Sequence, residues 1–279
     1  MKTQALKGMR DLLPNEQTLR DYIQGKILET YRASGFERIS TPMLEDMENL
    51  DKSDGGDNLN LIFKVLKRGD KLTAALNSGD PKELSDMGLR YDLTLPLSRF
   101  YAANKDKLPH PFKVIQTDRV FRAERPQKGR MRQFHQINCE CLGPSEPYAD
   151  AELVTMAMRF LEALGLKDLS LQLNSLGCPT CRPAYRETLR KWLSELDESA
   201  LCEDCRRRMV TNPLRVLDCK VPSCREHTAE APKILDHNCP DCAAHFETVR
   251  RLLDAEKVPY VINHRLVRGL DYYTRTTFE

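Results

Sequence analysis

The chain has 279 residues, enough for one large domain and a smaller one, and charged residues make up 30% of it. Its 43 basic and 41 acidic residues nearly cancel, so any nucleotide or nucleic-acid contact must come from a local patch. The start lacks the apolar run of a signal peptide, and no stretch approaches the ~20 apolar residues of a membrane span. These features exclude a membrane protein and predict a cytoplasmic one.

The first third of the chain predicts a helix and several short strands. Apolar residues at three- and four-residue spacing predict a helix over 15–34, which ends before Gly35. Short strands are predicted over 36–40 and 60–66, and a short helix over 96–103.

Alternating residues predict a strand over 89–95. Leu89, Tyr91 and Leu93 would share one face, and Arg90, Asp92 and Thr94 the other. An acid and a hydroxyl side by side, Asp92 and Thr94, could receive an ammonium group. An edge strand that shows its polar face to water would explain the same pattern.

A strand, a basic loop and a second strand are predicted between Phe112 and Leu142. The turn contains Pro126 and Gly129, which favour a reversal of the backbone. Period-two alternation puts Gln136 and Glu140 on one face of the second strand, roughly 13 Å apart at ~3.3 Å per residue. Six cations crowd this hairpin and suit phosphate oxygens, although a solvated basic hairpin is the alternative: Arg119, Arg122, Arg125, Lys128, Arg130 and Arg132.

The rest of the chain alternates helices with short strands. Helices are predicted over 147–164, 183–196 and 242–256, and strands over 169–173, 260–263 and 273–278. Gly269 permits a close backbone approach beside Arg268. Tyr272 and Tyr273 are adjacent on an extended segment, so at most one of them can line a substrate pocket.

Eight of the ten cysteines fall in four closely spaced pairs. Cys-x-x-Cys turns bring two thiolates to tetrahedral zinc distance, and two such turns complete a site. The count allows two four-cysteine structural zinc sites, or one site with leftover thiols, and no βαβ pattern favours redox chemistry. The candidate ligands are Cys178, Cys181, Cys202, Cys205, Cys219, Cys224, Cys239 and Cys242.

Three stretches carry a resemblance to a known family. Phe121-Arg122-Ala123-Glu124-Arg125, followed by Arg130-x-Arg132-Gln133-Phe134-His135-Gln136, resembles motif 2 of class II aminoacyl-tRNA synthetases in its histidyl form. Lys7-Gly8-Met9-Arg10-Asp11-Leu12-Leu13-Pro14 is similar to the opening signature of histidyl-tRNA synthetases, and Leu266-Val267-Arg268-Gly269-Leu270-Asp271-Tyr272-Tyr273-Thr274 to their histidine-specific motif. The helix, strand and proline of residues 15–42 resemble class II motif 1, which builds the family's dimer interface, although an ordinary amphipathic helix explains the spacing equally well.

The resemblance implies an activity and a set of site residues. L-Histidine would react with ATP, accompanied by Mg²⁺, to give histidyl-adenylate, and the histidyl group would pass to tRNA(His) on a homodimeric enzyme. Arg122, Arg268 and Gln136 would be the catalytic residues, with Arg122, Glu124 and Arg130 on the ATP side. The histidine site would comprise Asp92, Thr94, Arg122, Gln136, Glu140, Arg268, Tyr272 and Tyr273.

The implied fold is α+β, a class II synthetase-like antiparallel sheet flanked by helices. The catalytic core would occupy residues 1–169, a small Cys-rich insertion 170–259, and a return to the core 260–279. The family continues with a glycine-rich Arg-Tyr motif, motif 3 and an anticodon-binding domain. None occurs here, so we expect a C-terminally truncated fragment with impaired ATP activation.

Two other classes of protein share some of these features. One is a non-catalytic histidine-sensing paralogue, such as the regulatory subunit of an ATP phosphoribosyltransferase, although a sensor would not need Arg122 and Arg268. The other is a zinc-stabilised RNA-binding module with a vestigial synthetase core, for which metal analysis and the salt dependence of tRNA binding are the tests.

Overall fold

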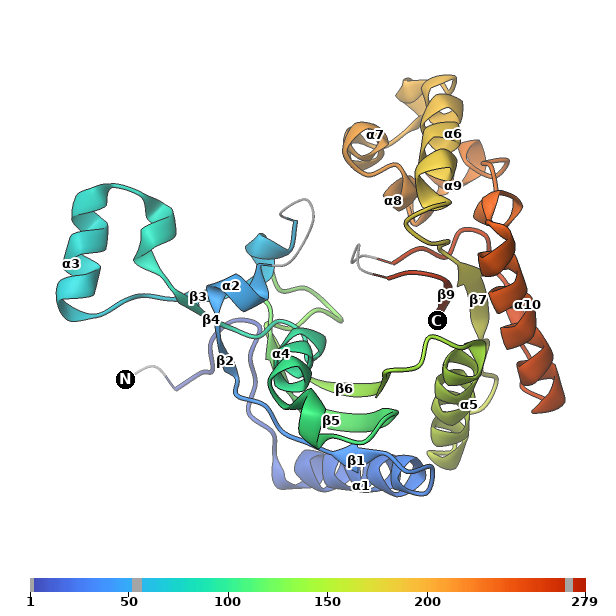
Figure 1. The fold of residues 1–279 in the computed structure, drawn as a ribbon. Helices are drawn as coiled ribbons and strands as arrows, with labels where there is room; N and C mark the ends of the chain where they lie inside the picture. Colours follow the sequence, from blue (N-terminus) through green and yellow to red (C-terminus); the bar gives the residue numbers. More distant parts are fainter. Residues whose placement is uncertain (1–2, 52–56, 269–272) are drawn as a thin grey trace. The chain divides into compact units, whose positions relative to one another are not determined.

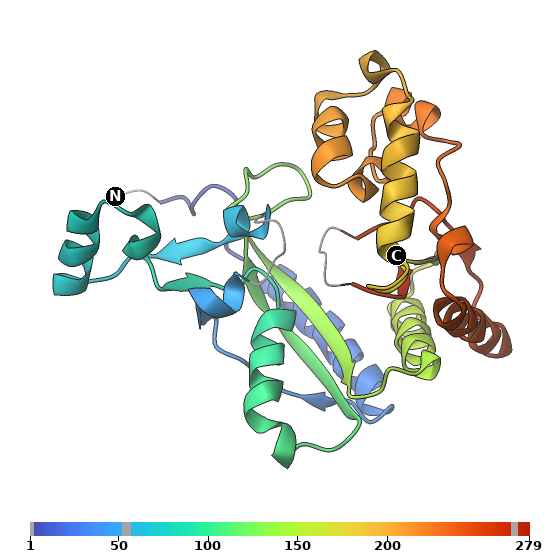
Figure 2. The same ribbon diagram turned by 45° about the horizontal axis from the view of Figure 1, so that its top comes forward.

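The computed structural model describes residues 3–51, 57–268 and 273–279. The chain forms two compact units, Met1–Pro144 and Ser145–Glu279, with two sheets described in the first and one in the second (Figures 1 and 2). The α+β class predicted from the sequence is confirmed.

A long hairpin is the centre of the first unit. β5 (Phe112–Phe121) pairs antiparallel with β6 (Gln133–Leu142) over ten consecutive positions, from Phe112 opposite Leu142 to Phe121 opposite Gln133. β1 (Glu37–Arg38) joins the outer edge of β5 in parallel. This hairpin matches the predicted strand, basic loop and strand within one or two residues.

One helix covers each face of the hairpin (Figure 2). α1 (Pro14–Arg32) lies against the face that carries Thr117 and His135, where Gln24 and Arg20 contact them. α4 (Thr94–Asn104) packs on the opposite face, where its Leu97 joins Phe112 and Val114 in a buried cluster. Because directly paired residues share a face, Glu140 opposite Val114 lies on the α4 side.

A second sheet of the first unit leads the chain to the start of α4. Its strands are β2 (Leu44–Asp46), β4 (Met87–Leu89) and β3 (Phe63–Val65), in the order β2-β4-β3 and all antiparallel. The other helical segments are α2 (Met47–Leu50), η1 (Asp57–Leu61), α3 (Gly69–Ser78), η2 (Pro81–Leu84) and η3 (Lys105–Lys107).

The strand predicted over 89–95 is wrong beyond Leu89. The extended strand stops there, Arg90 to Leu93 form an irregular connection, and Thr94 is the first residue of α4. Arg90, which alternation placed on a polar face, is fully buried. Its guanidinium bonds to the carbonyl oxygens of Thr41 and Arg119 and pairs with Asp118 at 2.8 Å, so local hydrogen bonds replace the predicted pleat.

The second unit contains a small mixed sheet backed by two helices. β7 (Gln172–Ser175) pairs in parallel with β8 (Val261–Ile262) and antiparallel with β9 (Thr276–Phe278). α5 (Pro147–Ala163) and α10 (Pro240–Ala255) contribute Val154 and Val249 to one core with Leu173 of β7.

The segment between β7 and α10 is helical and has its own core. It comprises α6 (Arg182–Ser194), η4 (Glu198–Ala200), α7 (Glu203–Thr211), α8 (Leu214–Leu217), α9 (Pro222–His227) and η5 (Ile234–His237). Its buried cluster includes Tyr185, Leu189, Val216 and the thiols of Cys205 and Cys224. Within the described ranges, none of the helices combines the length and the hydrophobicity that a transmembrane segment requires.

Candidate functional site

Four predicted pocket residues come together between β6 and the start of α4. Asp92 is 6% exposed, and its Oδ1 accepts a hydrogen bond from the Thr94 backbone N–H at 2.6 Å. The Gln136 Nε2 donates to Asp92 Oδ2 at 3.4 Å, and the Thr94 side chain hydrogen-bonds Glu140. Two carboxylates, an amide and a hydroxyl therefore share one polar cluster on the α4 side of the hairpin.

The Glu140 carboxyl is held by its own strand. Asn138 Nδ2, two residues earlier on the same face, donates to Glu140 Oε1 at 2.9 Å. Burial raises the pKa of Glu140, the nearby Asp92 charge raises it further, and hydrogen bonds from Asn138 and Thr94 oppose the shift. Such a carboxyl has a strong preference for a cationic or hydrogen-donating ligand.

The Gln136 amide retains capacity for a ligand. Its Oε1 is buried and, among the residues that the structure describes, has no hydrogen-bond partner. A buried polar atom without a partner is costly, so a bound molecule that donates to it would gain affinity.

Arg122 lies just past the end of β5, next to this cluster. Its Nε donates to the Tyr91 carbonyl at 3.2 Å, and its guanidinium lies over the Phe134 ring, 5.0 Å from the centroid. The backbone N–H of Arg122 bonds to the Arg132 carbonyl at 2.9 Å. An arginine fixed by a ring and a carbonyl is preorganised to bind an anion.

The other two predicted ATP-side residues belong to the loop of the hairpin. The Glu124 carbonyl accepts a hydrogen bond from Arg132 Nε at 3.0 Å. Arg130 is exposed at the turn, where it exchanges backbone hydrogen bonds with Gln127. The structure thus places Glu124 near the base of the loop and Arg130 at its exposed end.

The opening signature packs against this loop. Gly8 has a φ of +86° and its carbonyl accepts from the Arg132 N–H at 2.7 Å. A Cβ at Gly8 would lie 2.9 Å from side-chain carbons of Arg132 and Pro126, so only glycine fits this contact. The opening signature therefore supports the hairpin loop through a direct backbone and side-chain contact.

The histidine-specific motif lies in the second unit. The Arg268 guanidinium lies over the Tyr273 ring at 5.2 Å from the centroid, and the Tyr273 carbonyl accepts a hydrogen bond from Arg182. Tyr272, also predicted for the histidine site, lies outside the described residues.

Sequence reasoning missed three residues that support the pocket. Arg90, the residue before Tyr91, hydrogen-bonds to β5 through the Arg119 carbonyl. Asn138 orients Glu140, and the Phe134 ring packs against the Arg122 guanidinium. Period-two alternation along β6 placed Phe134 and Asn138 on the pocket face, so their roles were accessible from the sequence. Arg90 gave no such signal, because its partners are backbone carbonyls from distant segments.

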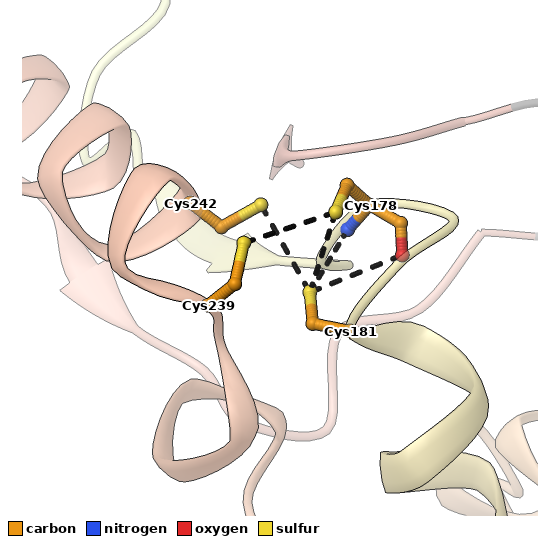
Figure 3. Close-up of side chains that lie close together, drawn as sticks. All are labelled: Cys178, Cys181, Cys239 and Cys242. Carbon is orange, nitrogen blue, oxygen red and sulfur yellow. Dashed lines mark hydrogen bonds between the residues drawn. The ribbon is translucent and has the colours of Figure 1, made fainter.

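The eight paired cysteines form two separate groups. The first quartet is Cys178, Cys181, Cys239 and Cys242, and the second quartet is Cys202, Cys205, Cys219 and Cys224. Within each quartet all sulfur atoms lie within 4.8 Å of one another. Figure 3 shows the first quartet, with two thiols from the loop before α6 and two from the start of α10.

The thiols differ in their electrostatic surroundings. Backbone hydrogen bonds from Cys181 and Thr180 lower the pKa of Cys178 to about 6, whereas burial raises the pKa of Cys205 and of Cys242. The first quartet has two half-buried thiols, Cys178 and Cys239, and the second has one, Cys202, while the other thiols are buried.

Comparison with known proteins agrees with this geometry. The family model described as "Histidyl-tRNA synthetase" matches residues 8–279. The chain is 50% identical over 279 residues to the histidine–tRNA ligase of Nitratidesulfovibrio vulgaris strain Hildenborough, covering 100% of this chain and 64% of the relative. It is 45% identical over 275 residues to that of Oleidesulfovibrio alaskensis, covering 98% of this chain and 63% of the relative.

Solved structures show the same fold. Apo Staphylococcus aureus histidyl-tRNA synthetase matches with a TM-score of 0.72 and 28% identity, over 100% of this chain and 61% of that one. A protein from Bacillus halodurans, described as an ATP phosphoribosyltransferase regulatory subunit/histidyl-tRNA synthetase, matches with a TM-score of 0.70 at 20% identity, over 100% of this chain and 72% of that one, and this likeness concerns the fold alone. The chain spans about 64% of the length of the curated relatives it matches. With the family match over residues 8–279 and the class II fold, the chain belongs to the histidyl-tRNA synthetase family.

Proposed function

We propose that this chain takes part in histidine–tRNA ligation, the activation of L-histidine with ATP and the transfer of the histidyl group to tRNA(His). The observation that carries the proposal is the polar cluster of Asp92, Thr94, Gln136 and Glu140 beside Arg122. The relatives named histidine–tRNA ligase support the same activity.

The polar cluster fits the two ends of histidine. Asp92 and the Thr94 hydroxyl would accept hydrogen bonds from the α-ammonium group, because a buried carboxylate gains most from a cationic donor. Glu140 and Tyr273 would hydrogen-bond the imidazole. An amino acid without these nitrogens would leave Glu140 unpaired, which gives selectivity against it.

Arg122 and Arg268 would bind the phosphate at which the reaction occurs. A histidine carboxylate oxygen attacks the α-phosphorus of ATP, the bond from that phosphorus to the β-phosphate bridging oxygen breaks, and pyrophosphate leaves. The transition state carries negative charge on the α-phosphoryl oxygens, which two opposed guanidinium groups would stabilise. No protein nucleophile is needed, since positioning and charge supply the acceleration.

Glu124 and Arg130 would serve the nucleotide. Glu124, near the base of the hairpin loop, would face the adenine side, and Arg130 at its end would contact the outer phosphates. Among the described residues, the groups of three or more side chains with metal-ligating geometry are both made of cysteines. Mg²⁺ would accompany ATP, bound to its phosphates, where it neutralises charge.

Gln136 would act in both steps. Its buried Oε1 and its Nε2 lie beside Asp92, in reach of the amino-acid end of the substrate. In the transfer step a terminal ribose hydroxyl of the tRNA attacks the acyl carbon, the bond from that carbon to the phosphate oxygen breaks, and AMP leaves while its phosphate takes up the hydroxyl proton. Gln136 would hold the carboxyl group in place during both attacks.

We also propose a cytoplasmic homodimer built through α1. Large apolar side chains stand exposed along and just before this helix, with Leu13, Leu19 and Tyr22 each more than half exposed at 63%, 59% and 53%. Exposed apolar faces of this kind are typical of subunit interfaces. Sedimentation equilibrium tests the dimer, and Leu19→Asp would dissociate it if α1 forms the contact.

Titration calorimetry with L-histidine tests the proposed recognition. Wild-type chain should bind L-histidine, and L-leucine should bind at least about 10-fold more weakly because Glu140 would lose its donor. Equal affinity for both amino acids would contradict the proposal. Histidine binding with no ATP binding would instead support a histidine sensor.

A further inference from the structure

The spacing of the sulfur atoms fits a single tetrahedral ion in each quartet. A Zn–S distance of ~2.3 Å in a tetrahedron puts the sulfurs about 3.8 Å apart. In the first quartet the sulfur–sulfur distances Cys178–Cys181, Cys178–Cys239 and Cys181–Cys242 are 3.7, 3.8 and 3.9 Å. In the second, Cys202 and Cys219 are 3.9 Å apart. A disulfide would need ~2.05 Å, so these sulfurs are arranged around a common centre rather than paired.

The backbone around each quartet is shaped for charged sulfur. The N–H of Cys178 donates to Cys181 Sγ at 3.2 Å, and the N–H of Cys202 donates to Cys224 Sγ at 3.1 Å. Gly177 has a φ of +62°, and a Cβ there would lie 2.8 Å from Cys181 Sγ. The loop therefore leaves room for the sulfur only because residue 177 is glycine.

Helix N-termini meet both quartets. Cys181 and Cys239 are the N-caps of α6 and α10, and Cys202 is the N-cap of α7. A divalent ion with four thiolates carries a net charge of −2, which helix N-termini stabilise. Near the second quartet, Arg265 donates to the Thr228 carbonyl and hydroxyl at 2.7 and 2.8 Å, and the Thr228 hydroxyl donates to the backbone carbonyl of Cys224 at 2.7 Å.

We propose that this chain binds two structural zinc ions, one in each quartet, and that the ion in the first quartet fixes the segment that carries Tyr273. Four sulfurs in a tetrahedron suit zinc, or a single iron, among the biological metals. Both sites are closed by protein ligands, so the ions hold structure and activate no water.

The residues that flank Cys178 and Cys181 are hydrogen-bonded to the segment of Tyr273 and Arg275. The Leu176 N–H donates to the Arg275 carbonyl at 2.7 Å, and the Arg275 N–H donates to the Gly177 carbonyl at 2.8 Å. Arg182, the residue after Cys181, donates to the carbonyls of Leu176 and Tyr273. Fixing Cys178 and Cys181 on an ion therefore fixes the loop to which residues 273–275 are bonded.

The second quartet lies in the core of the helical segment between β7 and α10. Its thiols Cys205, Cys219 and Cys224 belong to the same buried cluster as Tyr185 and Leu189 of α6. The short helices α8 and α9 have four and six residues and are too short to be stable alone. An ion here would hold these helices together and leave the Leu176–Arg275 contact unaffected.

Metal content tests the two sites. Protein purified without chelator should contain two zinc ions per chain, and Co²⁺ substitution should give the intense visible bands of tetrahedral thiolate coordination. Cys239→Ser/Cys242→Ser and Cys219→Ser/Cys224→Ser should each retain one ion per chain. Chain that contains no zinc and binds none on titration, a single ion in the wild type, or iron in place of zinc would overturn the proposal.

Hydrogen exchange on wild-type protein tests the structural roles without requiring any variant to fold. Removing zinc with a chelator should speed exchange of the Leu176 and Arg275 amides at least about tenfold. Without the ion, the loop that carries Cys178 and Cys181 should open locally at a lower free-energy cost. The first-quartet variant should show the same change, and the second-quartet variant should show it only in α7 to α9. Unchanged exchange at Leu176 and Arg275 after zinc loss would refute the link. Neither measurement uses a substrate, so their outcome is independent of the proposed ligase activity.

Substitution of Gly177 tests the shape of the loop, and substitution of Gly165 is the matched control. Gly177→Ala and Gly165→Ala both place a side chain at positive φ, +62° and +81°, but a Cβ at Gly165 meets nothing within 4 Å. Gly177→Ala should weaken zinc binding in the first quartet at least about tenfold, as competition with a chromophoric chelator measures, while Gly165→Ala should leave it unchanged. Equal zinc affinity in the two variants would show that the loop does not shape the site.

Discussion

The Gln136 amide reaches across from β6 to the Asp92 carboxylate, with Nε2 and Oδ2 3.4 Å apart. This contact joins the strand that carries Glu140 to the connection that begins α4. Two parts of the chain more than forty residues apart thus build one polar cluster, and the consequences for binding and stability can be measured separately.

Glu140→Gln should stabilise the first unit and weaken histidine binding. Burial raises the folded-state pKa of Glu140 above its ordinary 4.5, so the folded chain holds this proton more tightly than the unfolded chain. The free energy of unfolding therefore falls as pH rises from about 4.5 to the raised pKa and is constant above it. Glutamine does not ionise, so the Glu140→Gln variant does not show this decrease. Denaturant unfolding at pH 4 and pH 8 should show the gain at pH 8 only, and a larger gain at pH 4 would contradict this account.

Asp92→Asn should lower histidine affinity about 10- to 100-fold, because asparagine keeps the acceptor for the Thr94 N–H but loses the charge that would meet the ammonium group. Asp46→Asn is the matched control, since Asp46 accepts from the Glu48 N–H at 2.8 Å in a similar turn at the start of α2. Calorimetry should find that the Asp46→Asn variant binds histidine with the affinity of the wild type. A similar loss in both variants would assign Asp92 a purely structural role.

Arg90→Ala should destabilise the first unit by about 3–5 kcal/mol, because it leaves Asp118 and several buried carbonyls without their donor. Arg190→Ala removes an exposed ion pair with Glu187 on α6 and should cost about 1 kcal/mol or less. Denaturant midpoints measure both. If the two variants lose the same amount, the buried arginine does not organise the connection to Asp92.

Gly8→Ala should destabilise the first unit more than Gly35→Ala. Both positions have positive φ, +86° and +80°, and share a backbone cost of about 1–2 kcal/mol, but only at Gly8 would the Cβ meet other atoms, 2.9 Å away. The difference in melting temperature therefore reports the contact between the opening signature and the hairpin loop. No difference would mean that this contact contributes nothing to stability.

Arg122→Ala and Arg268→Ala should each weaken ATP binding in the presence of histidine by about 10-fold. If both guanidinium groups bind the same phosphate, the double variant should depart from the sum of the single losses by more than about 0.5 kcal/mol. Strict additivity in this double-mutant cycle would place the two arginines on different parts of the ligand. That they share one phosphate is a prediction carried from the sequence.

The long periodic elements were predictable and the connections were not. The helix expected over 15–34 is Pro14–Arg32, and the hairpin strands end within one or two residues of the expected positions, because long segments with a regular apolar period carry a clear signal. The segment from Arg90 to Thr94 was wrongly predicted as a strand from its alternating polar and apolar residues. Arg90 is polar but fully buried, because it hydrogen-bonds to backbone carbonyls of distant segments, so the alternation does not mark the two faces of a strand. Asp92 and Thr94 nevertheless lie together, because a turn also brings residues two apart to one side.

The sequence predicted that the cysteines act in closely spaced pairs, but it did not show which pairs form one group. Spacing alone could not decide which turns combine, and the structure joins Cys178–Cys181 with Cys239–Cys242 across most of the helical segment. That pairing depends on β7 and α10 packing in one core, which no local signal encodes. The predicted domain limits at 169 and 259 stay predictions, as do the roles assigned to the individual site residues.

The most direct test of the histidine–tRNA ligase proposal is calorimetric binding of a nonhydrolysable histidyl-adenylate analogue. An enzyme that forms this intermediate should bind the analogue at least about 100-fold more tightly than L-histidine, because both halves of the site are engaged at once. Glu140→Gln should lose much of that affinity, and the corresponding leucyl analogue should bind poorly. Analogue affinity no greater than that of L-histidine would contradict the proposed activity.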